Sequence, residues 1–74
     1  MLEMRPDCES CGKDLPADMP GALICSFECT FCEKCNTEKL HDICPNCGGN
    51  LNPRPTRSPE LLMKYPASTD RKFD

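Results

Sequence analysis

The chain has 74 residues, a formal net charge of −3 and eight cysteines, but no Trp, one Tyr and three Phe. A chain of this length forms one domain at most, and so few apolar residues cannot stabilise it without cross-links. No apolar run is long enough to cross a bilayer, and the first residues carry Glu3 and Asp7 where a secretory signal is apolar. We therefore expect a small cytoplasmic domain, with no membrane contact, whose reduced cysteines bind metal.

The first half of the chain predicts a hairpin followed by a short helix. KDLPADMPG, residues 13–21, has the prolines and polar residues of an irregular loop. The apolar run ALI then leads to Cys25, so we expect a short β-hairpin around Cys25 and Cys29, with Phe27 and Phe31 in the core. NTEKLHDI, residues 36–43, predicts a helix that begins at capping residues 36–37.

A change of composition predicts a domain boundary at residue 50. Residues 1–50 would form a two-zinc module, and residues 51–74 a proline-rich basic tail that can be removed without loss of zinc. Within the tail, Ser58 and Pro59 are helix-start residues and predict a short helix over 59–65. Two turns of helix are unstable alone, so this helix must dock on the module or on another protein. Its apolar residues are the candidate partner-binding residues: Leu61, Leu62 and Tyr65.

Charge separates these two segments as well. Residues 1–50 hold four basic and nine acidic side chains, net −5, whereas residues 51–74 hold five basic and three acidic, net +2. The tail should therefore be attracted to the module. A module this acidic repels phosphate backbones, so nucleic acid is not an expected partner.

The cysteines are spaced as metal ligands. Three pairs have two intervening residues, a spacing that lets a tight turn direct both sulfurs at one ion, and the remaining pair has three. Eight thiolates fill two tetrahedral four-sulfur sites, and soft sulfur ligands select zinc, with iron among the alternatives. The sequence therefore predicts two Zn²⁺ ions, each with four Cys ligands. The ligands are Cys8, Cys11, Cys25, Cys29, Cys32, Cys35, Cys44 and Cys47.

Neighbouring residues support the turns but leave the pairing open. Gly12 and Gly48 follow the second cysteine of CESC and CPNC, where a left-handed backbone brings N–H groups toward the sulfurs. His41 is at ligand-compatible spacing from Cys44, but with two sites already filled we expect it to face solvent or cap a helix. Spacing alone permits an interleaved pairing, a pairing shifted by one ligand because Cys29, Cys32 and Cys35 are each three apart, or a sequential one, in which the first four cysteines share an ion.

The order of short and long gaps over residues 8–47 resembles that of RING domains. The resemblance implies a RING-like, treble-clef cross-brace with a short hairpin, one short helix and little hydrophobic core. It also implies that the first and third pairs share one ion, and the second and fourth the other. The two ligand sets would be Cys8, Cys11, Cys32 and Cys35, and Cys25, Cys29, Cys44 and Cys47.

RING domains support ubiquitin ligation, but this chain lacks most of the contact residues that the resemblance would require. Glu9 and Ser10 stand where an Ile or Leu is usual, and Gly48 stands where a basic residue usually follows the last ligand. The shared ligand spacing therefore does not predict ubiquitin-ligase activity for this chain.

Taken over nearly its full length, the chain resembles a family of short bacterial proteins known only as domain of unknown function 1272. RPDCESC, LICSFECTFC, CPNCGG and the run RPTR…PAST carry this resemblance. It implies a stand-alone bacterial cytoplasmic protein and supplies no activity.

The residues favour no catalytic role. A closed four-sulfur site has no open position for a reacting water, and no Ser/His/Asp set surrounds the single His. We expect a non-enzymatic structural zinc module that acts as a small adaptor for a protein partner. The alternatives are a RING-type ligase, a nucleic-acid-binding zinc protein, and a thiol redox or zinc switch.

Overall fold

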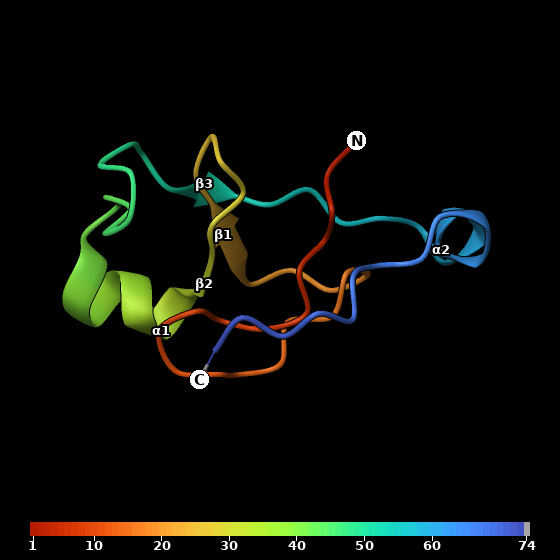
Figure 1. The fold of residues 1–74 in the computed structure, drawn as a ribbon, viewed down its shortest axis with the longest axis horizontal. Helices are drawn as coiled ribbons and strands as arrows, with labels where there is room; N and C mark the ends of the chain where they lie inside the picture. The colour runs from red at the N-terminus through yellow and green to blue at the C-terminus, as the bar shows by residue number, and fades with distance from the viewer. Residues whose placement is uncertain (74) are drawn as a thin grey trace.

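A three-stranded antiparallel sheet lies at the centre of the structure, a computed structural model that describes residues 1–73 (Figure 1). Its strands are β1 (Ala22–Ile24), β2 (Thr30–Cys32) and β3 (Asn52–Pro53), in the order β2-β1-β3. A short helix, α1 (Glu33–Cys35), follows β2 and continues as the π turn η1 (Asn36–Leu40). The remaining helix, α2 (Pro59–Lys64), lies at the opposite end of the molecule (Figure 1). The expected small domain with a hairpin and a short helix is confirmed.

The β1–β2 hairpin buries one of its two phenylalanines. Phe31 in β2 pairs with Leu23 and is 2% exposed, as predicted. The same prediction is wrong for Phe27, which is 72% exposed. Phe27 lies in the turn between the strands, where its N–H donates to the sulfur of Cys25 at 3.3 Å and Glu28 has a φ of 64°. Because the turn holds the Phe27 N–H toward the Cys25 sulfur, the Phe27 side chain faces solvent.

The buried core of the domain contains as many cysteines as apolar side chains. The buried cluster has five apolar side chains and five cysteines in contact. The apolar members are Leu15, Ala22, Leu23, Phe31 and Leu51, and the cysteines are Cys8, Cys25, Cys32, Cys35 and Cys44. Burial of so few apolar groups stabilises a domain weakly. The fold therefore depends on whatever the cysteines bind.

The helix after β2 begins three residues earlier than predicted. Its N-cap is Cys32, whose sulfur accepts the N–H of Cys35 at 3.4 Å, a role that capping preferences for Ser, Thr, Asp and Asn do not reveal. Asn36 is not a cap. Its side chain donates to Asp42 and accepts the Asp42 N–H, both at 2.8 Å. His41 ends the helix in a left-handed conformation and is exposed, as expected.

The folded core extends past the boundary predicted at residue 50. Leu51 is buried, β3 joins the sheet, and Arg54 is only 6% exposed. The Arg54 guanidinium donates to three backbone oxygens, of Arg5 at 2.8 Å, Leu15 at 3.0 Å and Pro16 at 3.4 Å. Composition indicated a separate, removable tail here, but one buried cation connects three segments. Beyond it, α2 lies within the predicted range, with the Ser58 hydroxyl accepting the N–H of Leu61 at 3.3 Å.

We expect the substitution Arg54→Met to lower the free energy of unfolding of the metal-loaded protein by about 3 kcal/mol. It keeps the apolar stem but leaves three carbonyl oxygens without their charged donor. Denaturant unfolding followed by circular dichroism measures the change. The control is Lys64→Met, which removes an equal charge from an exposed position on α2 and should change stability little. Equal effects of the two substitutions would contradict the structural role of Arg54.

Candidate metal centres

The first cysteine cluster, centre 1, brings together four sulfurs from two distant segments. The Sγ atoms of Cys8, Cys11, Cys32 and Cys35 all lie within 4.8 Å of one another. Cys8 and Cys11 come from the turn after the N-terminal arm, whereas Cys32 ends β2 and Cys35 ends α1. The Sγ atoms of Cys11 and Cys32 are 3.7 Å apart. Tetrahedral coordination with metal–sulfur bonds of about 2.3 Å requires about 3.8 Å. Centre 1 therefore fits a four-coordinate ion.

The second cluster, centre 2, lies at the turn of the same hairpin. The Sγ atoms of Cys25, Cys44 and Cys47 lie within 4.8 Å of one another. Cys29 lies beside them: burial, together with the sulfurs of Cys25 and Cys44, raises the pKa of the Cys29 thiol to about 11 although Asn46 lowers it. The clusters thus pair first with third and second with fourth, which is the interleaved arrangement. No sequential grouping of the eight cysteines occurs.

Each of the four cysteine turns points a backbone N–H at a sulfur. The four donors are 3.3–3.4 Å from their acceptors. The donor and acceptor pairs are Ser10 and Cys8, Phe27 and Cys25, Cys35 and Cys32, and Gly49 and Cys47. Gly12 and Gly48 have φ values of 79° and 78°, the left-handed conformation expected after a ligand pair. Such N–H groups stabilise negative charge on sulfur, so these turns favour thiolates.

The same N–H groups make one thiol in each centre easy to ionise. Burial alone would raise the pKa of Cys25, but the N–H groups of Phe27 and Cys29 lower it to about 7. Cys32 is similar: its pKa falls to about 7 against the effect of burial, mainly because of the Cys35 N–H. Burial and the neighbouring sulfurs raise the pKa of Cys35 to about 12, although Ser10 lowers it. Four thiolates in one cluster therefore require a cation, which favours the ionised form of every ligand.

Two acidic residues support centre 1, and sequence reasoning did not find either. Glu9 accepts the Thr30 N–H at 2.8 Å and pairs with Arg5 at 3.0 Å, which fixes the first cysteine turn to β2. Asp7 is fully buried and accepts backbone N–H groups from the C-terminal segment. Burial would raise the Asp7 pKa, but these N–H groups and the Arg71 charge hold it below its usual value. In the sequence, a buried acidic residue next to a cysteine cannot be told apart from an ordinary acidic residue on the surface.

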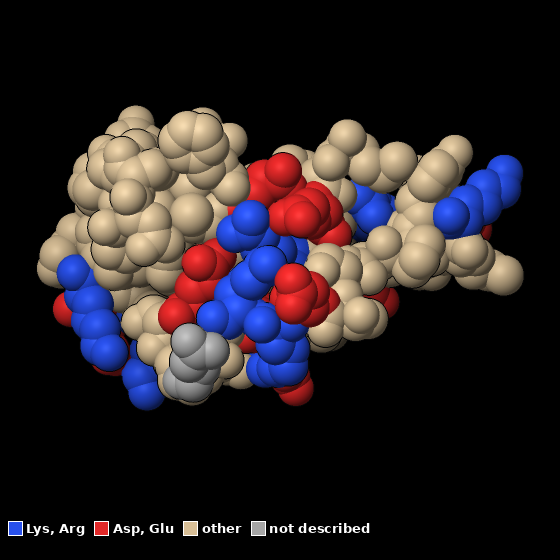
Figure 2. All heavy atoms as spheres, in the orientation of Figure 1, with Lys and Arg blue, Asp and Glu red and all other residues tan. Residues whose placement is uncertain are grey.

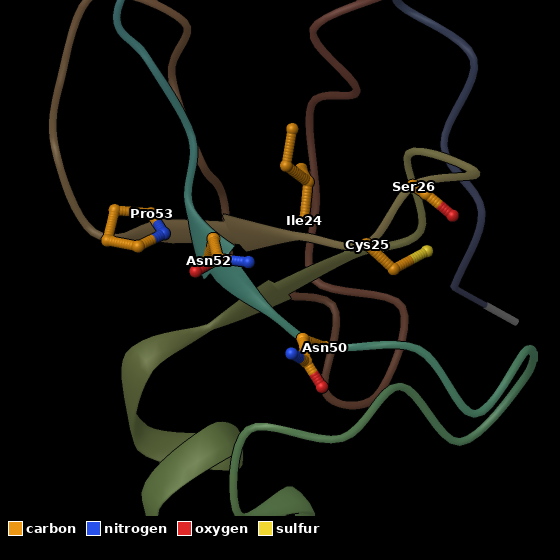
Figure 3. Close-up of a pocket in the computed structure, with 6 residues that line it drawn as sticks. All are labelled: Ile24, Cys25, Ser26, Asn50, Asn52 and Pro53. Atoms are coloured by element: carbon orange, nitrogen blue, oxygen red, sulfur yellow. The ribbon is translucent and has the colours of Figure 1, made fainter.

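A shallow pocket of about 390 Å³ opens beside centre 2 (Figure 3). It is lined by Ile24, Cys25, Ser26, Asn50, Asn52 and Pro53. Apart from the ligand Cys25, none of these residues titrates near neutral pH, so the pocket offers no acid–base pair.

Of the predicted partner-binding residues, Leu61 and Leu62 lie on α2 and Tyr65 is its C-cap. Helix α2 lies at the end of the molecule opposite α1 (Figure 1). Leu61 and Tyr65 are exposed and Leu62 is half-buried. Leu61 also lines a groove of about 400 Å³ between α2 and the N-terminal arm. The other residues of this groove are Leu2, Met4, Pro55, Thr56, Arg57 and Ser58.

Fold and site together define a class of small domain in which two interleaved cysteine clusters, each suited to a metal ion, are built on one hairpin. The chain belongs to the family described as Protein of unknown function (DUF1272), whose model matches residues 1–57. These residues include all eight cysteines and Arg54.

A protein of Rhizobium meliloti (strain 1021), named Uncharacterized protein R02474, is 58% identical over 71 residues, which cover 96% of this chain and 84% of the relative. No solved structure matches the chain. Within residues 1–73, no helix has the length and apolar character needed to cross a membrane.

Proposed function

We propose that this chain is a structural zinc module of the cytoplasm that presents an apolar surface on α2 to a protein partner. Both centres offer sulfur ligands alone, a donor set that selects zinc or iron over hard cations, and zinc is the usual ion of closed four-cysteine structural sites. None of the eight cysteines, which all lie in the described part of the chain, forms a disulfide. Free thiols in this number suit a reducing compartment.

The observation that carries the interaction proposal is the exposed apolar surface at α2, which we call the α2 surface. It consists of Leu61, Met63 and Tyr65, all exposed, and the adjoining apolar groove. Helices this short do not persist alone in water. Here Arg57 anchors α2 by donating to the carbonyl oxygens of Tyr65 and Leu2, both at 2.7 Å. An apolar patch that the fold itself holds in place is typical of a binding surface.

Two other roles have less support. All four positions of a filled centre would belong to sulfur, which leaves none for a substrate or reacting water, so the proposed function is not enzymatic. In the middle of the face in Figure 2, basic and acidic side chains are interspersed in one band, and further basic side chains lie toward both ends of the molecule. Arg5 pairs with Glu3 and Glu9 at 3.0 Å, and Arg71 with Asp14 at 2.8 Å. Paired cations of this kind give little attraction for nucleic acid.

Affinity capture with matched surface variants tests the proposal. Proteins captured from the native cell by the wild-type chain should be lost with Leu61→Asp/Tyr65→Asp, because charge in the α2 surface opposes apolar burial. For a purified partner we expect at least tenfold weaker binding by titration calorimetry, which corresponds to about 1.4 kcal/mol. Both chains should keep two zinc ions, because the substituted residues are remote from the cysteines.

The control is Phe27→Asp, which places a charge on a more exposed apolar residue at the hairpin turn. This variant should retain the partner. If the same partner binds all three proteins equally well, the α2 surface is not the recognition element.

A further inference from the structure

The C-terminal segment, residues 70–73, lies along the first cysteine turn, and we call it the strap. In Figure 1 the end of the chain runs beside the N-terminal segment. Asp7, which directly precedes the ligand Cys8, accepts the N–H of Phe73 at 2.9 Å and that of Lys72 at 3.1 Å. Its carboxylate is fully buried beneath these contacts. The strap therefore holds the residue on one side of the Cys8–Cys11 turn.

The strap also holds the other side of this turn. The Arg71 guanidinium donates to the carbonyl oxygen of Gly12 at 2.7 Å and to the carboxylate of Asp14 at 2.8 Å. The ring of Phe73 packs against Gly12 so closely that a Cβ atom at Gly12 would lie 2.7 Å from its Cδ2 atom. Gly12 directly follows the ligand Cys11. The strap thus contacts the residues on both sides of the first ligand pair.

The rest of the N-terminal arm is attached to the tail in the same manner. Its carbonyl oxygens at Leu2, Glu3 and Arg5 accept hydrogen bonds from tail donors at 2.7–2.9 Å. Those donors are Arg57, Ser68 and Arg54. Without the tail, the Cys8–Cys11 pair would be joined to the sheet mainly by the hydrogen bonds between Glu9 and Thr30.

Centre 2 has no such support. Among residues 1–73, no hydrogen bond or ion pair joins the strap to the turns that carry Cys25, Cys29, Cys44 and Cys47. Its fourth sulfur also lies outside the tight group that the other three form.

We propose that the strap locks the metal of centre 1 in place, so that centre 2 is the exchangeable centre of the protein. The inference rests on the proposed zinc function. An ion leaves a four-sulfur site only after its ligands detach, and a detached pair on a tethered arm rebinds before the ion escapes. Because Asp7 and Gly12 flank the pair, strap contacts keep Cys8 and Cys11 at high effective concentration around the ion. The strap is a positioning element and supplies no ligand.

Thiol labelling of the zinc-loaded, full-length protein tests the proposal. N-ethylmaleimide is added with a chelator, and peptide mass spectrometry follows two pairs: Cys8 and Cys11 report centre 1, whereas Cys44 and Cys47 report centre 2. In the wild type we expect centre 2 to be labelled first. The variant Arg71→Ala/Phe73→Ala should label centre 1 about tenfold faster and leave centre 2 unchanged, because charge-assisted contacts to Asp14 and packing on Gly12 are lost.

The control is Glu60→Ala/Lys64→Ala, which truncates two exposed tail residues on α2 outside the α2 surface and should change neither rate. An unchanged centre 1 rate in the strap variant would overturn the proposal. Equal acceleration at both centres would also overturn it, because it indicates general loss of stability. If the wild-type chain binds no zinc and all eight thiols react at once, both the zinc function and this inference fail. If only the strap proposal is wrong, the result is different: the protein binds two ions, and Cys8 and Cys11 are labelled at the same rate in the strap variant as in the wild type.

Discussion

We expect removal of the metal ions from both centres to unfold this protein at room temperature and neutral pH. Structural zinc centres contribute about 10 kcal/mol each at pH 7, whereas typical domains are stable by only about 5–15 kcal/mol in total. Five apolar side chains form the non-sulfur part of the core, and they cannot replace that contribution. Treatment with excess chelator under reducing conditions should abolish the far-ultraviolet circular dichroism of the fold and the dispersion of the amide resonances. Addition of two equivalents of zinc should restore both.

Reducing agent without chelator is the control for this experiment, since it breaks disulfides but leaves zinc bound. A protein that keeps its spectrum in chelator, or loses it in reductant alone, would contradict metal-dependent folding.

Double cysteine substitutions should lose zinc in a pattern set by the interleaved pairing. Cys11→Ala and Cys35→Ala remove ligands of one centre, so the double variant should lose only one zinc ion. Cys11→Ala and Cys29→Ala affect different centres, so that combination should lose both. Effects within one site overlap, whereas effects at separate sites add. Native mass spectrometry in zinc-buffered solution gives the number of ions directly.

A sequential pairing reverses this pattern, because Cys11 and Cys29 would then share an ion and Cys35 would bind the other. Loss of two ions from the Cys11/Cys35 variant would therefore contradict the structure. The Cys11/Cys29 variant is at the same time a direct test of Cys29 as the fourth ligand of centre 2.

The ligand pattern was the most predictable part of the molecule. Cysteines at turn spacing restrict which sulfurs can converge, and the gap order shared with RING domains implied the interleaved grouping that the structure has. Loop, hairpin and tail helix followed from proline positions, apolar runs and capping residues. Each of these signals is local, within a few residues of the element it predicts.

The features that were missed depend on contacts between distant segments or on unusual roles for sulfur. Phe27 and Phe31 are equivalent in composition, but only Phe31 lies in a strand and faces the core. A cysteine sulfur caps the helix at Glu33, which capping statistics for oxygen side chains do not anticipate. Arg54 is a single basic residue in a proline-rich run, and its three carbonyl partners are 38 to 49 residues away in sequence.

The order of these contacts along the chain sets when folding can finish. Leu51, β3, Arg54 and the strap all follow the last cysteine, and each is needed to hold segments made much earlier. Because a chain leaves the ribosome with its N-terminus first, the cysteines emerge before the residues that enclose them. Assembly can finish only after residues 51–73 have emerged, and until then the sulfurs are open to oxidants and to competing ions.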